Sequence, residues 1–161
     1  MHELPAPQHT FLARLIGKWT SEMTASMVPG EPEYTSRGVE RVRSLGGFWA
    51  VCEGEGNTPD GDTHRSLMTL GYDTARGRYV GTFVASMMSQ LWLYDGTLDA
   101  SGDVLTLSTE GPSFAEPGKI APYRDVIAFE GDDRRTMTSY TPMPDGTWQA
   151  FMTARYRRVT A

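Results

Sequence analysis

Arg124 and Asp125 are adjacent charged residues within an otherwise apolar run, and either of them could act in a functional site. Neighbouring strand residues point to opposite faces, so only one of the two faces inward. The larger apolar set, Tyr123, Ile127 and Phe129, shares the face of Asp125. A buried aspartate needs a partner, such as an interior arginine. An inward Arg124 would instead bind an anion or a carboxylate, and an internal ion pair or an exposed arginine is the simpler alternative.

Glutamates form a second candidate group, spread over the first three predicted strands at Glu22, Glu40, Glu53 and Glu55. Two carboxylates that face each other about 5–9 Å apart can perform acid–base catalysis. The sequence does not determine that geometry, and a solvated outer face is the simpler interpretation. We therefore assign no catalytic residue.

Metal-binding and nucleophilic motifs are missing from the sequence. Only His64 of the three histidines lies on a predicted strand, and no cluster has the spacing of a zinc site. No serine has a G-x-S-x-G elbow, and the glycine motifs of nucleotide-binding loops are absent. Cys52 fits a small buried apolar residue. We expect no cofactor and no metal.

Methionines and aromatic residues recur at alternate positions of several predicted strands. Trp19, Met23 and Met27 share one face of the first strand. The last strand carries another such set: Trp148, Ala150, Met152, Ala154 and Tyr156. Such faces are typical either of ordinary core packing or of a soft, apolar pocket wall. The candidate ligand-binding residues are Met23, Met27, Arg43, Met68, Tyr72, Phe83, Trp92, Arg124, Tyr140 and Met152.

Strands separated by turns must position these side chains. One short helix is predicted over residues 8–16, where Phe11, Leu12, Leu15 and Ile16 form an apolar stripe. Glycine- and proline-rich turns then separate predicted strands at residues 17–28, 34–44, 47–56, 63–73, 78–87, 90–99, 104–111, 121–130, 134–141 and 147–157.

Turns this short leave no room for crossover helices, so the strands must be antiparallel. Closing into a barrel removes the exposed edges of such a meander. We expect an all-β fold, an up-and-down antiparallel barrel of about ten strands, calycin- or lipocalin-like, with a short N-terminal helix. A two-sheet sandwich is the alternative.

A Gly17-Lys18-Trp19 sequence follows the predicted helix, and Arg155, Arg157 and Arg158 lie at the end of the last strand. In lipocalin-type barrels a tryptophan in this place packs under an arginine from near the end of the chain. A buried tryptophan and unrelated surface arginines are the simpler interpretation. In both cases the role of Trp19 is structural.

The composition and charge of the chain argue against several classes of protein. The chain has 161 residues, 39% of them hydrophobic and 22% charged, which predicts one globular domain over residues 1–161. A net charge of −5 argues against nucleic-acid binding. No apolar run is long enough to span a membrane, and the N-terminus lacks the pattern of a signal peptide. With a single cysteine, these features predict a cytoplasmic protein.

Six blocks together resemble the domain of unknown function 1579 family, a group of uncharacterised bacterial proteins: LIGKWTSEM, VRSLGGFW, TLGYDTARGRYVGTFVASM, LWLYDGTLD, YRDVIAFEGDDRRTMTSY and PDGTWQAFMTARYRR. The resemblance covers nearly the whole chain and implies a calycin-like barrel but no activity. Phe83 and Ala85 stand where the family more often has Trp and Asp. More distantly, the architecture is similar to fatty-acid-binding proteins and to nitrobindin-like haem barrels. The latter bind haem through a late histidine, which this chain lacks after His64.

We therefore predict a binding protein for a small apolar or amphipathic molecule, with Arg124 or Arg43 anchoring a carboxylate if the ligand has one. An enzyme that uses acid–base chemistry in the same cavity is the first alternative. A homodimeric interaction module is the second. No membrane or nucleic-acid partner is expected.

Overall fold

A closed antiparallel barrel forms the body of the protein. The computed structural model describes residues 1–26, 31–58 and 60–160. The elements are α1 (His9–Leu15), β1 (Gly17–Ala25), β2 (Tyr34–Leu45), β3 (Trp49–Asn57), β4 (Thr63–Asp73), β5 (Arg78–Ala85), β6 (Trp92–Leu98), β7 (Val104–Pro112), β8 (Ile120–Phe129), β9 (Arg134–Pro142) and β10 (Trp148–Arg158). Each strand pairs with its neighbour in the chain, and β1 pairs with β10 to close the ring. The predicted barrel with a short N-terminal helix is confirmed, and the sandwich alternative is wrong.

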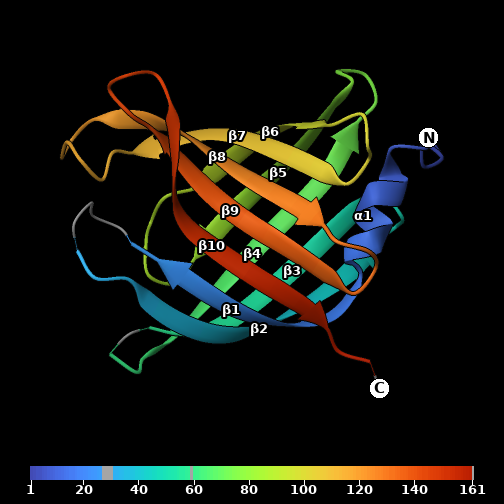
Figure 1. Cartoon of the computed structure of the whole chain (residues 1–161). Helices are drawn as coiled ribbons and strands as arrows, with labels where there is room; N and C mark the ends of the chain where they lie inside the picture. The colour runs from blue at the N-terminus through green and yellow to red at the C-terminus, as the bar shows by residue number, and fades with distance from the viewer. Residues whose placement is uncertain (27–30, 59, 161) are drawn as a thin grey trace.

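Helix α1 covers one end of the barrel, and the β1–β2, β3–β4, β5–β6, β7–β8 and β9–β10 loops lie at the other end (Figure 1). The helix is too short to be stable alone, so packing must hold it. Phe11, Leu12 and Leu15 are buried, as the predicted apolar stripe requires. This end of the barrel is therefore closed by side chains, whereas the other end is bounded by loops.

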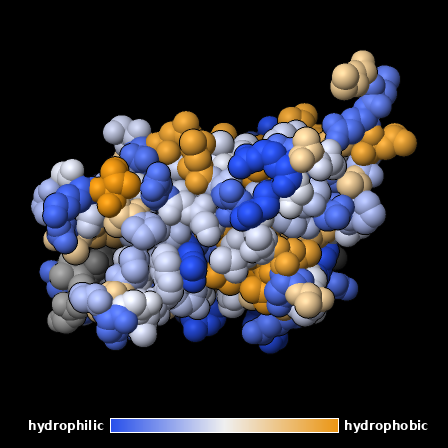
Figure 2. Space-filling view, turned by 90° about the horizontal axis from the view of Figure 1, so that it is seen from above, coloured by the Kyte–Doolittle hydropathy of each residue, from blue (hydrophilic) through white to orange (hydrophobic). Residues whose placement is uncertain are grey.

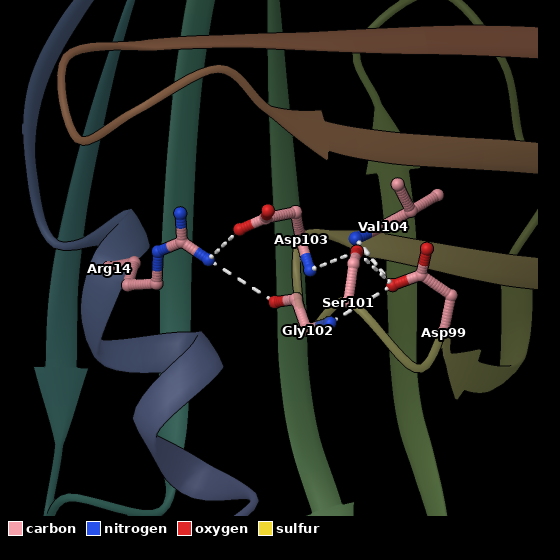
Figure 3. Close-up of polar contacts among 6 residues, drawn as sticks. All are labelled: Arg14, Asp99, Ser101, Gly102, Asp103 and Val104. Atoms are coloured by element: carbon pink, nitrogen blue, oxygen red, sulfur yellow. Dashed lines mark hydrogen bonds and ion pairs between the residues drawn. The ribbon is translucent and has the colours of Figure 1, made fainter.

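Arg14 ties α1 to the β6–β7 loop (Figure 3). Its Nη1 donates to Asp103 Oδ1 at 2.9 Å and to the Gly102 carbonyl oxygen at 3.2 Å. Asp99 organises this loop by accepting hydrogen bonds from the Gly102 and Val104 amides. The guanidinium of Arg14 also lies 4.1 Å from the ring centroid of Phe129. The helix is thus anchored by hydrogen bonds to a loop far away in the sequence and by a ring contact to the end of β8.

Trp19 and Arg158 close the barrel as the sequence predicts. The two residues are paired across β1 and β10, and the Arg158 guanidinium lies 4.2 Å from the indole centroid. Arg158 also donates to the carbonyl oxygens of Ile16 at 2.6 Å and Arg14 at 2.7 Å. Gly17 has a φ of 132°, and a Cβ there would lie 2.7 Å from Arg158 Nη1. A glycine at this corner therefore permits the arginine to approach.

A bulge in β10 changes which of its side chains face inward. The pairing with β9 shifts between Ala150 and Met152, and both Phe151 and Met152 line the interior. Trp148 instead stacks with Arg124, at 3.9 Å. The prediction that Trp148 and Ala150 share the inner face of Met152 is wrong, because one extra residue in a bulge shifts the alternation.

The outer surface carries apolar side chains in separate patches between hydrophilic ones, on the face that Figure 2 shows. Leu67 and Val84 are paired across β4 and β5 and are both exposed, as is Leu93 on β6. The predicted homodimer stays a prediction. Among the described residues, no helix is long and apolar enough to cross a membrane.

Replacing Arg158 with alanine removes a stacked guanidinium and its hydrogen bonds to the partly buried carbonyl oxygens of Arg14 and Ile16. We expect Arg158→Ala to lower the free energy of unfolding by about 2–3 kcal/mol. The matched control is Arg157→Ala, since Arg157 is exposed on the same strand, and its effect should stay within about 0.5 kcal/mol. Urea denaturation measures both values. Equal effects of the two substitutions would contradict the closing role of Arg158.

Candidate functional site

An internal cavity of about 290 Å³ lies in the barrel and reaches the end opposite α1. Next to α1 the interior is filled by fully buried side chains such as Leu70, Leu105 and Ile127. Towards the open end the walls are mainly methionines and aromatic residues: Met23, Met68, Phe83, Trp92, Phe151 and Met152. Met87, Met88 and Phe114 also line the cavity and are partly exposed. An apolar ligand would find flexible apolar walls here.

Asp125 is the centre of a polar network in the cavity wall. Its Oδ2 accepts a hydrogen bond of 2.5 Å from the Tyr94 hydroxyl, and its Oδ1 accepts one of 2.6 Å from Ser139 Oγ. Asp125 and Ser139 are directly paired across β8 and β9, so strand register brings them together. All three residues line the cavity. The network thus presents a carboxyl group to the cavity, beside its methionine and aromatic walls.

Burial dominates the protonation chemistry of this network. It raises the pKa of Asp125 above its ordinary value, although the hydrogen bonds from Ser139 and Tyr94 oppose that change. Burial, followed by the neighbouring Asp125 charge, holds the pKa of Tyr94 well above 10. The phenol therefore stays protonated and acts as a donor, while the carboxyl is the group in this network that gains or loses a proton.

A second inward carboxylate, the half-buried Glu40, has a charged partner. Arg135 Nη2 donates to Glu40 Oε1, and its side chain is only 3% exposed. The Arg135 guanidinium also lies 3.9 Å from the Tyr156 ring centroid and 4.6 Å from that of Trp19. Burial raises the pKa of both Tyr156 and the nearby Cys52 thiol. Cys52 is a buried thiol that stays protonated, which confirms its predicted role as a small apolar residue.

Two polar atoms of the cavity lining are buried without a hydrogen-bond partner among the described residues. They are Thr109 Oγ1 and His64 Nδ1. Buried polar atoms are usually paired. Each is a point where a bound molecule could supply the missing contact.

The structure brings half of the predicted binding residues together. Lining the cavity are Met23, Met68, Phe83, Trp92 and Met152. Tyr72 packs at the closed end, with its ring centroid 4.8 Å from that of Tyr79. Met27 lies outside the described residues. Tyr140 is absent from the lining because Ser139 beside it takes the inward position.

Arg43 and Arg124, the predicted anion anchors, both lie on the outer face. Arg43 is exposed and lies 3.8 Å from the Glu53 carboxylate. Arg124 is exposed and stacks on Trp148. Side chains alternate between the two faces of a strand, which explains why both arginines point outward. Buried Val42 precedes Arg43, and inward Asp125 follows Arg124. Neither of the two arginines that the sequence suggested for binding an anion therefore faces the cavity.

Sequence reasoning missed several residues of the site. Glu40 was grouped with the solvated glutamates, but it is half-buried and paired with Arg135, whereas Glu22 and Glu53 are exposed as expected. Tyr94 and Ser139 carried no motif. The apolar neighbours of Asp125 were the one available signal, and they indicated its inward orientation correctly. Among the described residues, no group of three or more His, Cys, Asp or Glu side chains could hold a metal ion.

Comparison with known proteins places the barrel in a family. The family described as "Protein of unknown function (DUF1579)" matches residues 4–158. None of the curated proteins compared with the chain matches it.

Among similar solved structures, Rv2717c from M. tuberculosis has a TM-score of 0.70 at 15% identity, over 96% of this chain and 99% of that chain. The S-type phycobiliprotein lyase CPES from Guillardia theta has a TM-score of 0.60 at 14% identity, over 94% and 92%. The barrel EF1p2_mFAP2b, bound to DFHBI, has a TM-score of 0.51 at 14% identity, over 94% and 99%. At these identities the likeness shows the fold.

The raised pKa of Asp125 predicts a specific pH dependence of stability. As pH rises above the ordinary carboxyl pKa, the unfolded chain releases this proton before the folded one does, so the stability contributed by protonated Asp125 is lost. Relative to Asp125→Asn, the free energy of unfolding of the wild type should fall as pH rises above about 4, by at most about 1.4 kcal/mol per pH unit. Denaturant titrations at several pH values measure the difference.

Asp99→Asn is the control of opposite sign. The hydrogen bond from Ser101 is the main reason that the pKa of Asp99 is lowered, so its stabilisation is present at neutral pH and lost as pH falls. Relative to this variant, the wild type should gain stability with rising pH. A gain with rising pH against Asp125→Asn as well would contradict the assigned pKa direction of Asp125.

Proposed function

The chain belongs to the DUF1579 family of proteins of unknown function, and from that premise we propose that it binds a small, largely apolar molecule inside its barrel. The cavity of about 290 Å³ carries the proposal, because side chains leave this space unfilled and its walls are flexible and apolar. A protein that used the barrel only as a scaffold would be more stable with this space packed.

Cavity volume limits the size of the ligand. Each water occupies about 30 Å³ in the liquid, so 290 Å³ corresponds to about ten non-hydrogen atoms. The partly exposed Met87, Met88 and Phe114 could move aside to admit the ligand or cover part of a longer one. A short amphiphile or a small aromatic compound fits these dimensions.

Similar barrels support the proposal by analogy of fold. One is a phycobiliprotein lyase, and another has been observed bound to DFHBI. A shared fold does not define a shared ligand, so the cavity of this chain remains the main argument. The proposal also places the protein in the cytoplasm, in keeping with its single cysteine.

Catalysis in the same cavity is a second candidate function, favoured by Asp125. An acid–base enzyme needs an interior group that exchanges protons, and the Asp125 carboxyl faces the cavity with a raised pKa. Native mass spectrometry of wild type and Asp125→Asn separates the two functions. A binding protein returns its bound molecule chemically unchanged, and Asp125→Asn carries the same molecule or less of it, whereas an enzyme accumulates in Asp125→Asn a substrate that added wild type converts.

Blocking the cavity tests the proposed binding. Ala85 lines the cavity, and Val84 beside it is exposed, so Ala85→Trp fills the cavity while Val84→Trp adds the same side chain outside. We expect Ala85→Trp to weaken binding of an uncharged solvatochromic dye about ten-fold or more, and Val84→Trp to leave it unchanged. Fluorescence titration measures both affinities. Equal binding by the two variants, or no binding by the wild type, would contradict the proposal.

A further inference from the structure

We infer that the polar end of the ligand is a primary ammonium group that binds Asp125, with its alkyl or aryl part in the methionine-rich cavity. This inference rests on the proposed function and adds the chemical class of the ligand. The ammonium group takes the place of the carboxylate group that the sequence suggested for the ligand.

Every arginine near the cavity is already engaged or exposed. Arg135 is buried, but Glu40 and two aromatic rings hold it. Arg37, at the rim, is 84% exposed and lies 3.7 Å from the Glu22 carboxylate. Arg43 and Arg124 lie outside the cavity. An anionic ligand would thus meet two carboxyl groups and no uncommitted arginine.

Asp125, in contrast to these arginines, faces the cavity without a charged partner among the described residues. Its two hydrogen-bond donors, Tyr94 and Ser139, are neutral, so no described residue compensates a negative charge on it. A carboxylate offers about four acceptor positions, and these two bonds use only half of them. An ammonium group supplies both the missing donors and the missing charge, which is the strongest partner that a desolvated carboxylate can have.

Thr109 offers a further acceptor on the path to the open end. Asp125 is paired with Leu107 across β7 and β8, and Thr109 is the next inward residue of β7 towards the open end. Its buried hydroxyl has no partner among the described residues. Since an ammonium group has three N–H donors, it can bind the carboxylate and still donate to this hydroxyl.

The loops around the open end would attract a cation. Their described charged residues are Glu31, Glu33, Asp60, Asp62, Glu116, Asp145 and Lys119. The single lysine is paired with Glu116 at 2.6 Å. Hydrogen bonds from Thr58 and Thr147 lower the pKa of Asp60 and Asp145, so both carboxylates are ionised at neutral pH. A negative rim raises the local concentration of cationic ligands.

Three matched probes test the inference: octylamine, octanol and sodium octanoate, each with an eight-carbon chain and a different head group. Displacement of the uncharged dye from wild type at neutral pH gives their affinities. We expect octylamine to bind about 10- to 100-fold more tightly than octanol, and octanoate to bind most weakly.

Asp125→Asn should remove most of the octylamine advantage and leave octanol within about three-fold of its wild-type affinity. The matched control is Glu110→Gln, which removes an exposed carboxylate from the outer face of β7 and should leave the order of the probes unchanged. Circular dichroism establishes that each variant is folded.

A pH series on the wild type gives a second test that needs no Asp125 variant. Octylamine stays protonated at acid pH, so its affinity should fall on acidification as Asp125 takes up a proton, while that of octanol stays constant. The other ionisable residues of the described cavity lining are Glu40, Glu55, Arg37, His64 and four tyrosines, Tyr34, Tyr94, Tyr123 and Tyr156, and Glu40 is paired with Arg135 behind the wall. Because His64 also lines the cavity, the same fall must persist in His64→Gln.

The outcomes distinguish the two proposals. Displacement by all three probes with equal affinity, or tightest binding of octanoate, would overturn the ammonium inference and leave the binding function standing. An octylamine preference that survives in folded Asp125→Asn would also overturn it. If neither the dye nor octanol binds the wild type, the proposed function itself fails.

Discussion

The indole of Trp19 is the contact on which both the closure of the barrel and the floor of its cavity depend. Arg158 stacks on it from the end of β10 and bonds the carbonyl oxygens that join α1 to β1. Arg135 stacks on the same indole from β9 and holds Glu40. The indole is completely buried. One side chain thus links the helix, the first and last strands and the buried ion pair below the cavity.

The two inward carboxyl groups differ in their partners. Arg135 pairs with Glu40 and stacks on the Trp19 and Tyr156 rings, whereas no ion pair is made by Asp125 among the described residues. The two inward carboxyl groups are therefore unlike: Glu40 belongs to the structural base, whereas Asp125 faces the cavity with neutral donors only.

Prediction from sequence succeeded where local rules determine the outcome. Glycine and proline turns separated the strands, short connections required antiparallel pairing, and Gly17-Lys18-Trp19 with a late arginine indicated the closing contact. Alternation also identified Met23, Met68 and Phe83 as cavity residues. On β8 the larger apolar set indicated that Asp125 points inward, but on β2 alternation alone did not determine which face holds Arg43. The β10 bulge and the partners of Asp125 depend on pairing between strands, which local sequence patterns do not encode.

The destabilisation of the fold by an ionised Asp125 is itself an argument that this residue has a function. A carboxyl group buried beside apolar walls destabilises the fold whenever it is ionised, and an apolar residue of similar size would avoid that cost. Glu40 avoids most of it through Arg135, which shows that the barrel can supply a counter-charge. At Asp125 the chain supplies a tyrosine and a serine hydroxyl instead, which orient the carboxylate without neutralising it. A charge that is oriented but not compensated, and that faces a cavity, has the properties expected of a group whose partner arrives with the ligand.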